Sequence, residues 1–154
     1  MAAIHVHCTV RDAEARESLR LMTDYPRWAE ASDAIDRVVV TPSDDGSSTS
    51  FWEVTFRGGL MKWSERDSCD LDKLVHEFDL IEGDPHAFSG TWTATEVDGG
   101  CELRMTATFD LGMPSLSHVL DPIAVEALED AVVDAVHHLF GDRATVAYGE
   151  PAHA

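Results

Sequence analysis

The chain has 154 residues, of which 44% are hydrophobic, and its 29 acidic against 11 basic side chains give a formal net charge of −18. This length favours one domain, residues 1–154, large enough to bury a core and an internal cavity. No apolar run reaches the ~18 residues of a membrane span, and so negative a surface disfavours nucleic acid and anionic lipid as partners. The N-terminal residues lack the basic and apolar regions of a signal peptide, so we expect a cytoplasmic protein.

The cysteines and the N-terminal histidines give no metal or disulfide signal. Cys8, Cys69 and Cys101 are odd in number and far apart in sequence, which argues against a disulfide framework or a zinc site. His5 and His7 share one face of a predicted strand, but no acidic third ligand accompanies them. We therefore expect no metal and no cofactor.

The first part of the chain predicts one strand and two short helices. Residues 4–10 alternate apolar and polar side chains with the period of a half-buried strand. Residues 11–22 are rich in Ala, Glu and Arg and predict a short helix, which Pro26 ends because proline disfavours helical geometry at the residue before it. A second helical turn is expected at 27–31.

The middle of the chain predicts six strands, and the end predicts one long helix. The strands are separated by Gly-, Pro- and Asp-rich turns and cover residues 37–41, 50–56, 60–67, 74–81, 88–96 and 101–111. The helix covers 116–140, and residues 141–154 are expected to form a loose tail. This order predicts an α+β helix-grip fold, in which a curved antiparallel sheet of about seven strands wraps around the long C-terminal helix and encloses a cavity.

One stripe of the long helix is apolar and rich in alanine. Small residues in its centre leave room, so Ala127 and Ala131 are predicted to line the cavity. His138 lies at the edge of the stripe, one turn after Asp134, and is a candidate catalytic imidazole. The alternative is a histidine that interacts with the helix dipole at the C-terminal end.

The inward phase of the later strands predicts most of the cavity lining. Phe78, Phe88, Trp92 and Met105 belong to this phase. Gly90 belongs to it as well and predicts open volume opposite the small helix residues. His76 is a polar member of the same phase, so it is a candidate acid, base or hydrogen-bond donor; the alternative is a solvated position at the end of the sheet.

The strand at 60–67 has two readings, because a slip of one residue exchanges its two faces. Hydrophobicity alone favours Met61 and Trp63 inward, together with Glu65. The other register turns Lys62, Ser64 and Arg66 inward.

Several short motifs together resemble the polyketide cyclase/dehydrase branch of the START-like helix-grip (SRPBCC) superfamily, which includes aromatase/cyclases of bacterial polyketide pathways. The resemblance runs from about residue 4 to residue 140. Its motifs are Tyr25-Pro26-Arg27-Trp28, Trp63-Ser64-Glu65-Arg66, Gly90-Thr91-Trp92, Gly100-Cys101-Glu102-Leu103 and Phe109-Asp110-Leu111.

The resemblance implies a set of pocket residues. A serine and an arginine two residues apart line the family's pocket and match Ser64 and Arg66, with the arginine as the usual catalytic candidate. This implication favours the second register, which also places Lys62 at the pocket. Trp28, with Tyr25 in the same motif, and Trp92 match aromatic pocket positions. Leu60 and Lys62 depart from the pattern, because aromatase/cyclases tend to carry tryptophans there.

The resemblance implies an enzyme that folds and cyclises a poly-β-ketone by aldol addition and dehydration. Arg66 would stabilise the developing oxyanion, Ser64 would relay a proton, and His76 or His138 would act as acid or base. The alternative is a binding protein of the same fold that carries a lipid, a quinone or another hydrophobic metabolite without chemistry. An acyl carrier protein is expected to dock near Arg57, Lys62 and Lys73 if one docks at all, and a homodimer is compatible with the sequence.

Overall fold

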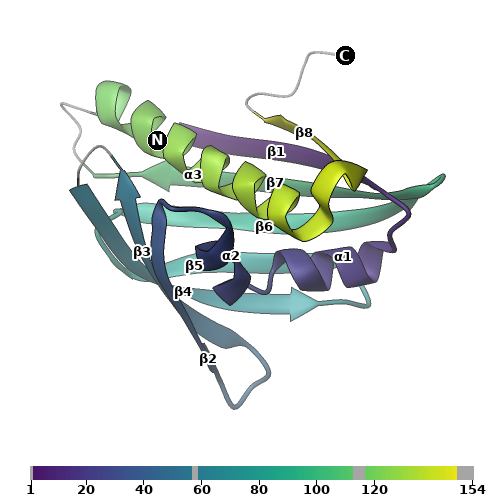
Figure 1. Ribbon diagram of the computed structural model, residues 1–154. Helices are drawn as coiled ribbons and strands as arrows, with labels where there is room; N and C mark the ends of the chain where they lie inside the picture. Colours follow the sequence, from purple (N-terminus) through teal and green to yellow (C-terminus); the bar gives the residue numbers. More distant parts are fainter. Residues whose placement is uncertain (1, 57–58, 113–116, 149–154) are drawn as a thin grey trace.

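The structure is a computed structural model that describes residues 2–56, 59–112 and 117–148 (Figure 1). The N-terminal part comprises β1 (Ala2–Arg11), α1 (Ala15–Met22) and α2 (Pro26–Ala31). Six strands follow: β2 (Ile35–Pro42), β3 (Ser48–Phe56), β4 (Gly59–Asp70), β5 (Val75–Gly83), β6 (Ala87–Val97) and β7 (Gly100–Asp110). The chain continues with α3 (Ser117–Phe140), a 3-10 turn (Gly141–Arg143) and β8 (Ala144–Tyr148).

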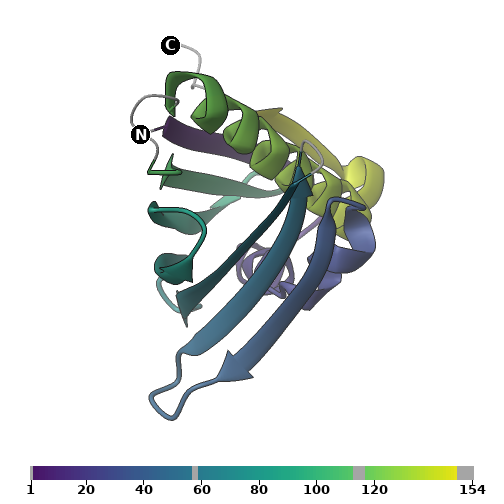
Figure 2. The same cartoon turned by 90° about the vertical axis from the view of Figure 1, so that its left-hand side faces the viewer.

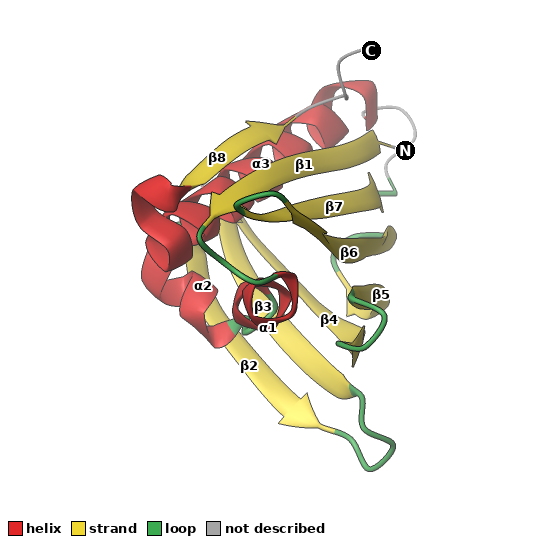
Figure 3. Cartoon of the chain, turned by 90° about the vertical axis from the view of Figure 1, so that its right-hand side faces the viewer, coloured by secondary structure: helices red, strands yellow, loops and turns green. Residues whose placement is uncertain are grey.

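All the described strands belong to one antiparallel sheet with the order β2-β3-β4-β5-β6-β7-β1-β8. Strands β2 to β7 follow one another as neighbours, and β1 closes the run beside β7. The sheet curls, and the three helices lie on its concave side, as Figure 3 shows. This arrangement confirms the predicted order of elements and the predicted curved sheet.

Side-chain hydrogen bonds join α1 to the sheet and α2 to α1. The backbone N–H of Ala15 begins α1 by donating to the carboxylate of Glu96 at the end of β6, at 2.5 Å. Pro26 is the first residue of α2, a position where its missing N–H costs nothing. The indole of Trp28 donates to the carbonyl oxygen of Met22 at 2.9 Å, so α2 is tied to the end of α1.

The long helix α3 lies across the sheet and packs against β1, β7, β8 and α2 (Figure 2). Its buried stripe includes Ala124, Leu128, Ala131, Val132 and Ala135, in agreement with the predicted apolar face. The stripe brings the helix close to the sheet because its central residues are small. Within the described residues, no helix is both long and apolar enough to cross a membrane.

The end of the chain differs from the prediction of a loose tail at 141–154. Residues 144–148 form β8, which pairs with β1 from Val10↔Ala144 to Val6↔Tyr148. The sheet therefore has eight strands rather than about seven. Without β8, the outer edge of β1 would present unpaired backbone groups. The segment with Ala144 and Val146 pairs with these groups as a short strand. Residues 149–154 lie outside the described part of the chain.

Candidate ligand cavity

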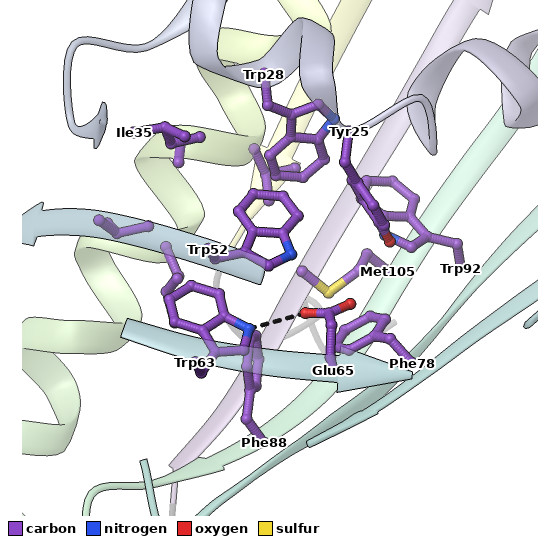
Figure 4. A pocket seen from close by; sticks show the side chains of 14 residues that line it. Tyr25, Trp28, Ile35, Trp52, Trp63, Glu65, Phe78, Phe88, Trp92 and Met105 are labelled. Carbon is purple, nitrogen blue, oxygen red and sulfur yellow. Dashed lines mark hydrogen bonds between the residues drawn. The ribbon is translucent and has the colours of Figure 1, made fainter. Parts of the chain in front are cut away.

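An apolar cavity lies between the concave face of the sheet and the helices α2 and α3 (Figure 4). All four tryptophans of the chain line it. The complete lining is Tyr25, Trp28, Ile35, Trp52, Val54, Trp63, Glu65, Phe78, Phe88, Trp92, Met105, Leu128, Ala131 and Val132. Seven residues predicted as ligand-binding therefore line this cavity: Tyr25, Trp28, Phe78, Phe88, Trp92, Met105 and Ala131.

Aromatic rings fill most of the space. The rings of Trp52 and Trp63 are stacked, 5.6 Å apart and 3° from parallel. Trp28 and Tyr25 meet Trp52 edge-on at 5.5 and 4.9 Å. The free space among the lining side chains is about 40 Å³, room for a few water molecules. Ligand pockets usually measure ~300–1,000 Å³, so a ligand of that size requires some of these rings to move.

Gly90 makes room for an aromatic ring and not for an open space. A β-carbon at this position would lie 2.6 Å from Cζ of Phe78, and 2.6 Å from Cβ of Ala107 as well. The sequence predicts open volume here. The structure shows that the ring of Phe78 takes that volume.

Strand β4 has the register that hydrophobicity alone favours. Met61, Trp63, Glu65 and Asp67 are each at most 3% exposed and face the concave side. Lys62, Ser64 and Arg66 consequently lie on the outer face of the sheet, against the register that the family resemblance favours. The physical reason is that Met61 and Trp63 bury large apolar surfaces and that the two buried carboxyl groups find partners inside.

Arg66 is far from a position where it could act on a ligand in the cavity. Its side chain is 60% exposed and pairs with Asp45 from the β2–β3 turn. Ser64 is half-buried on the same outer face, opposite Phe51 of β3. The prediction that Arg66 and Ser64 form the polar part of the pocket does not match this geometry.

Glu65 is the carboxyl group that reaches the cavity. Trp63 donates its indole N–H to Oε1 of Glu65 at 2.9 Å, shown by the dashed line in Figure 4. Burial raises the pKa of the Glu65 carboxyl well above its usual range, and the neighbouring Asp67 adds to the effect. Burial therefore favours the protonated form of Glu65, which can donate a proton or a hydrogen bond to a ligand oxygen.

Tyr25 brings a second proton-bearing group to the cavity. Its hydroxyl lies 3.0 Å from Nε2 of His76, which is 4% exposed and sits on β5. Burial raises the pKa of the Tyr25 hydroxyl well above its usual value, so the side chain stays neutral. His76, one of the predicted acid/base candidates, is thus inside the protein and reaches the cavity through Tyr25.

A further polar pair lies behind His76. Asp67 accepts a hydrogen bond from the hydroxyl of Ser50 at 2.5 Å, and that hydroxyl accepts one from the indole of Trp52 at 2.9 Å. The other carboxylate oxygen of Asp67, Oδ1, lies 3.8 Å from Nε2 of His76. The buried polar groups of the site therefore form a connected set around one apolar cavity.

His138 and Ala127 lie outside the cavity. The His138 side chain is 43% exposed, and its Nε2 lies 3.7 Å from Oε2 of Glu30 on α2. Ala127 lines an outer groove between α3 and the segment after α2. Asp130 and Asp134 of α3 line the same groove. The helix stripe is wider than the cavity, so only its part around Ala131 reaches the lining.

The basic residues predicted to receive a carrier are spread out. Lys62 is near the beginning of β4, and Lys73 follows its end. At ~3.3 Å per strand residue, the stretch from Lys62 to the end of β4 at Asp70 alone spans roughly 26 Å, so the two lysines lie at opposite ends of the strand. Arg57 lies outside the described residues.

Sequence reasoning missed Ser50, Trp52 and Asp67. Strand β3 alternates buried and more exposed residues, with Ser50, Trp52 and Val54 buried. The inward-facing residues of that strand could therefore have been predicted from the sequence. Asp67 is in phase with Met61, Trp63 and Glu65. Nothing in the pattern signals a buried Asp, because aspartate is rarely buried without partners that only the fold supplies.

Comparison with known proteins identifies the family. The sequence profile of the family described as polyketide cyclase/dehydrase and lipid transport matches residues 12–136. The chain belongs to this family. No protein with a curated description matches the sequence at a significant level.

Solved structures share the fold at low sequence identity. The protein TTHA0849 from Thermus thermophilus has a TM-score of 0.77 at 19% identity over 92% of this chain and 96% of that one. The ZhuI aromatase/cyclase from Streptomyces sp. R1128 has a TM-score of 0.73 at 16% identity, covering 92% and 94%. A START superfamily protein from Mycobacterium smegmatis has a TM-score of 0.72 at 12% identity, covering 92% and 99%. These likenesses show the helix-grip fold.

Proposed function

We propose that this family member binds a poly-β-ketone or a similar hydrophobic intermediate in the cavity and promotes its aldol cyclisation and dehydration. The observation that carries the proposal is the pair of proton-bearing groups, Glu65 and Tyr25, in an otherwise apolar lining. A protein that only carries lipid needs no buried acid at its binding surface, and burying one costs free energy. The family and the aromatase/cyclase fold relatives support the same general kind of ligand.

The first half of the reaction is the removal of a proton from the carbon between two carbonyl groups. Tyr25 takes this proton while its own hydroxyl proton passes to Nε2 of His76, so the enolate forms together with an imidazolium ion. The neutral carboxyl of Glu65 donates a hydrogen bond to the enolate oxygen and stabilises its charge. Water is largely excluded from the cavity, which strengthens both interactions.

The second half forms the ring. The enolate carbon attacks another carbonyl carbon of the same folded chain, and the electron pair of that carbonyl moves to its oxygen. The imidazolium returns its proton through Tyr25 to this oxygen, which restores His76 and Tyr25 and leaves a hydroxyl group. In the dehydration, Glu65 gives its proton to the departing hydroxyl, which leaves as water. The C–H bond on the adjacent carbon breaks to form the ring double bond, and the Glu65 carboxylate takes that proton, which restores its acid form.

Arg66 and Ser64 have no part in this route because they face away from the cavity. His138 has none for the same reason. The stacked tryptophans act as the template, since flat apolar walls favour one folded conformer of the ligand.

Docking of an acyl carrier protein is a separate part of the proposal. Lys62 and Lys73 carry exposed positive charge on a chain that is otherwise strongly acidic. If a carrier delivers the substrate there, Lys62→Glu lowers the rate with a carrier-bound substrate and leaves the rate with a free one unchanged. A rate with the carrier-bound substrate that is the same in Lys62→Glu as in the wild type would contradict carrier docking at Lys62.

The second candidate function is binding without chemistry. The observation that favours it is the density of aromatic rings, which suits a flat hydrophobic metabolite. Native mass spectrometry of the purified protein tests this function. A hydrophobic compound that co-purifies with the protein and is released from it chemically unaltered supports binding without chemistry.

The experiment for the proposed function supplies the protein with a poly-β-ketone made in situ by a ketosynthase and an acyl carrier protein. Products are compared with and without the protein by liquid chromatography and mass spectrometry. The proposal predicts that one cyclised, dehydrated product replaces the mixture of spontaneous products. An unchanged product distribution would contradict it.

A further inference from the structure

The carboxyl group of Asp67 is buried but does not line the cavity. It is 3% exposed and is held from one side by the hydroxyl of Ser50, 2.5 Å from Oδ2. Trp52 fixes that hydroxyl in turn through its indole N–H, at 2.9 Å. The side chain therefore has one orientation, and in it Oδ1 faces His76 at 3.8 Å from Nε2.

Two buried atoms at this point have no hydrogen-bond partner among the described residues. They are Oδ1 of Asp67 and Nδ1 of His76. Buried polar atoms are nearly always paired, and an exception needs an explanation. The free Oδ1 of Asp67 is explained if the site must also accommodate a protonated His76, whose Nε2–H would face it at 3.8 Å.

We propose that Asp67 is a positioning residue that stabilises the imidazolium form of His76. In the resting state the Tyr25 hydroxyl donates to Nε2, 3.0 Å away, and His76 carries its proton on Nδ1. When the Tyr25 O–H bond breaks, the proton bonds to Nε2, and the imidazolium forms beside the Asp67 carboxylate. The reverse transfer returns the proton to Tyr25 and restores the neutral ring.

This inference rests on the proposed function for its catalytic meaning, but the pairing itself needs no substrate. An opposite charge within ~4–6 Å raises the pKa of an imidazole by about one unit or more. Without Asp67, the enolate and the imidazolium would form in an apolar interior with no fixed negative group beside the ring. The transfer from Tyr25 would then be slower.

The other groups around His76 are few. Strand β4 presents Glu65, Asp67 and Cys69, the last directly opposite His76 in the sheet. Strand β6 presents the uncharged Trp92 opposite His76, and the segment before α2 presents Tyr25. Burial, together with a hydrogen bond and repulsion from Asp67, raises the pKa of Glu65 and favours its protonated form. By geometry, Asp67 is the carboxyl group that faces His76, with Oδ1 at 3.8 Å from Nε2.

The test is the titration of His76 in the full-length protein without any ligand. Uniform ¹⁵N-histidine labelling and two-dimensional NMR follow the ring nitrogens, and His76→Gln assigns the signal. In Asp67→Asn, which keeps the acceptor for Ser50 but removes the charge, we expect the protonation constant of His76 to fall about tenfold. Asp45→Asn, which removes an exposed carboxylate on the outer face, is the matched control and leaves the titration unchanged.

Ser50→Ala gives a second route if Asp67→Asn does not fold. It frees the Asp67 side chain, so the His76 titration shifts in the same direction by a smaller amount. With a cyclisable substrate, Asp67→Asn lowers kcat, leaves KM unchanged and moves the acid limb of the pH profile with the His76 titration. A His76 titration that is the same in the wild type and in the folded variant overturns the inference, whatever the activity. A shifted titration without any cyclisation supports the pairing and contradicts the proposed function alone.

Discussion

The hydroxyl of Tyr25 lies 3.0 Å from Nε2 of His76 and joins the segment before α2 to strand β5. The contact gives a buried histidine access to the cavity without exposing its ring to a ligand. It also places a neutral hydroxyl, and not a charged group, at the apolar surface. The site therefore presents two side chains that can carry a proton, Tyr25 and Glu65, at one cavity, where Figure 4 shows both.

Ligand binding should change the fluorescence of the protein strongly. All four tryptophans line the cavity, and a ligand larger than the free space must displace some of their rings. Titration with 1,8-dihydroxyanthraquinone, a flat aromatic compound of the size of a cyclised polyketide, is expected to quench the tryptophan emission in a saturable manner. A linear, non-saturable decrease would show that the cavity does not accept the compound.

Two alanines of α3 give a matched pair for the same titration. Ala131 lines the cavity as well as the outer groove, whereas Ala127 lines the outer groove and not the cavity. Ala131→Leu is expected to weaken binding at least tenfold, because the added side chain occupies the space that the ligand needs, and to cost ~1–3 kcal/mol of stability. Ala127→Leu adds the same volume outside and should change the affinity little. Equal effects of the two changes would place the binding site elsewhere.

Glu65 should make the protein less stable as the pH rises. The pKa of Glu65 is raised in the folded state, so above its ordinary value of ~4.3 the folded state keeps a proton that the unfolded state loses. A higher pH then favours unfolding, by up to ~1.4 kcal/mol per pH unit. Urea denaturation between about pH 5 and 7 is expected to show that Glu65→Gln gains stability relative to the wild type.

Asp45→Asn is the control for the pH dependence of the unfolding free energy. The pKa of Asp45 is lowered to about 2 by hydrogen bonds from Ser47, so this carboxyl does not titrate in the measured range. The variant should follow the pH dependence of the wild type. If the unfolding free energies of the wild type and of Glu65→Gln changed equally with pH, the result would contradict a raised pKa of the buried Glu65.

Gly90→Ala is expected to destabilise the fold by about 2 kcal/mol. The new methyl group would meet Cζ of Phe78 and Cβ of Ala107 at 2.6 Å, and the carbonyl oxygen of Thr106 at the same distance. Part of the loss should be recovered in Phe78→Leu, because the shorter side chain gives way. The unfolding free energies of the two single variants and the double variant measure this coupling.

One thiol per chain should react in the folded protein. Cys8 and Cys101 are buried, and burial raises the pKa of Cys8 to about 12, whereas Cys69 is exposed. Thiolates and not thiols attack disulfide reagents, so Ellman's reagent at about pH 8 should titrate Cys69 before the other two, and all three cysteines only after unfolding. Partial burial also raises the pKa of Cys69, so it should react more slowly than a free thiol. Rapid reaction of three thiols in the native protein would contradict the packing of β1 against β7.

Much of the fold was predictable because its periodicities are local. The alternation along β1 and β7 and the apolar stripe of α3 follow from side-chain spacing alone. The strand β8 was missed because five residues, among them three small apolar ones (Ala144, Val146 and Ala147), carry almost no signal. Its formation depends on the free edge of β1, which is a property of the assembled sheet.

The polar part of the site was predicted less well. His76 was recognisable as a polar residue on an apolar face, but its partners Tyr25 and Asp67 are 51 and 9 positions away in the sequence. On β4, the family resemblance favoured Arg66 inward, while the buried surface of Trp63 and Met61 decides the register. The tendency of aromatic side chains to be buried outweighed a two-residue motif.

The most direct test compares Glu65→Gln, Tyr25→Phe and Arg66→Ala in the cyclisation assay, with each variant first shown to be folded. Glu65 and Tyr25 face the cavity, whereas Arg66 is exposed and paired with Asp45. Loss of a general acid or base slows a reaction by ~100-fold or more. The account predicts such a loss in Glu65→Gln and Tyr25→Phe and wild-type cyclisation in Arg66→Ala. Full activity of both cavity variants together with an inactive Arg66→Ala would contradict it.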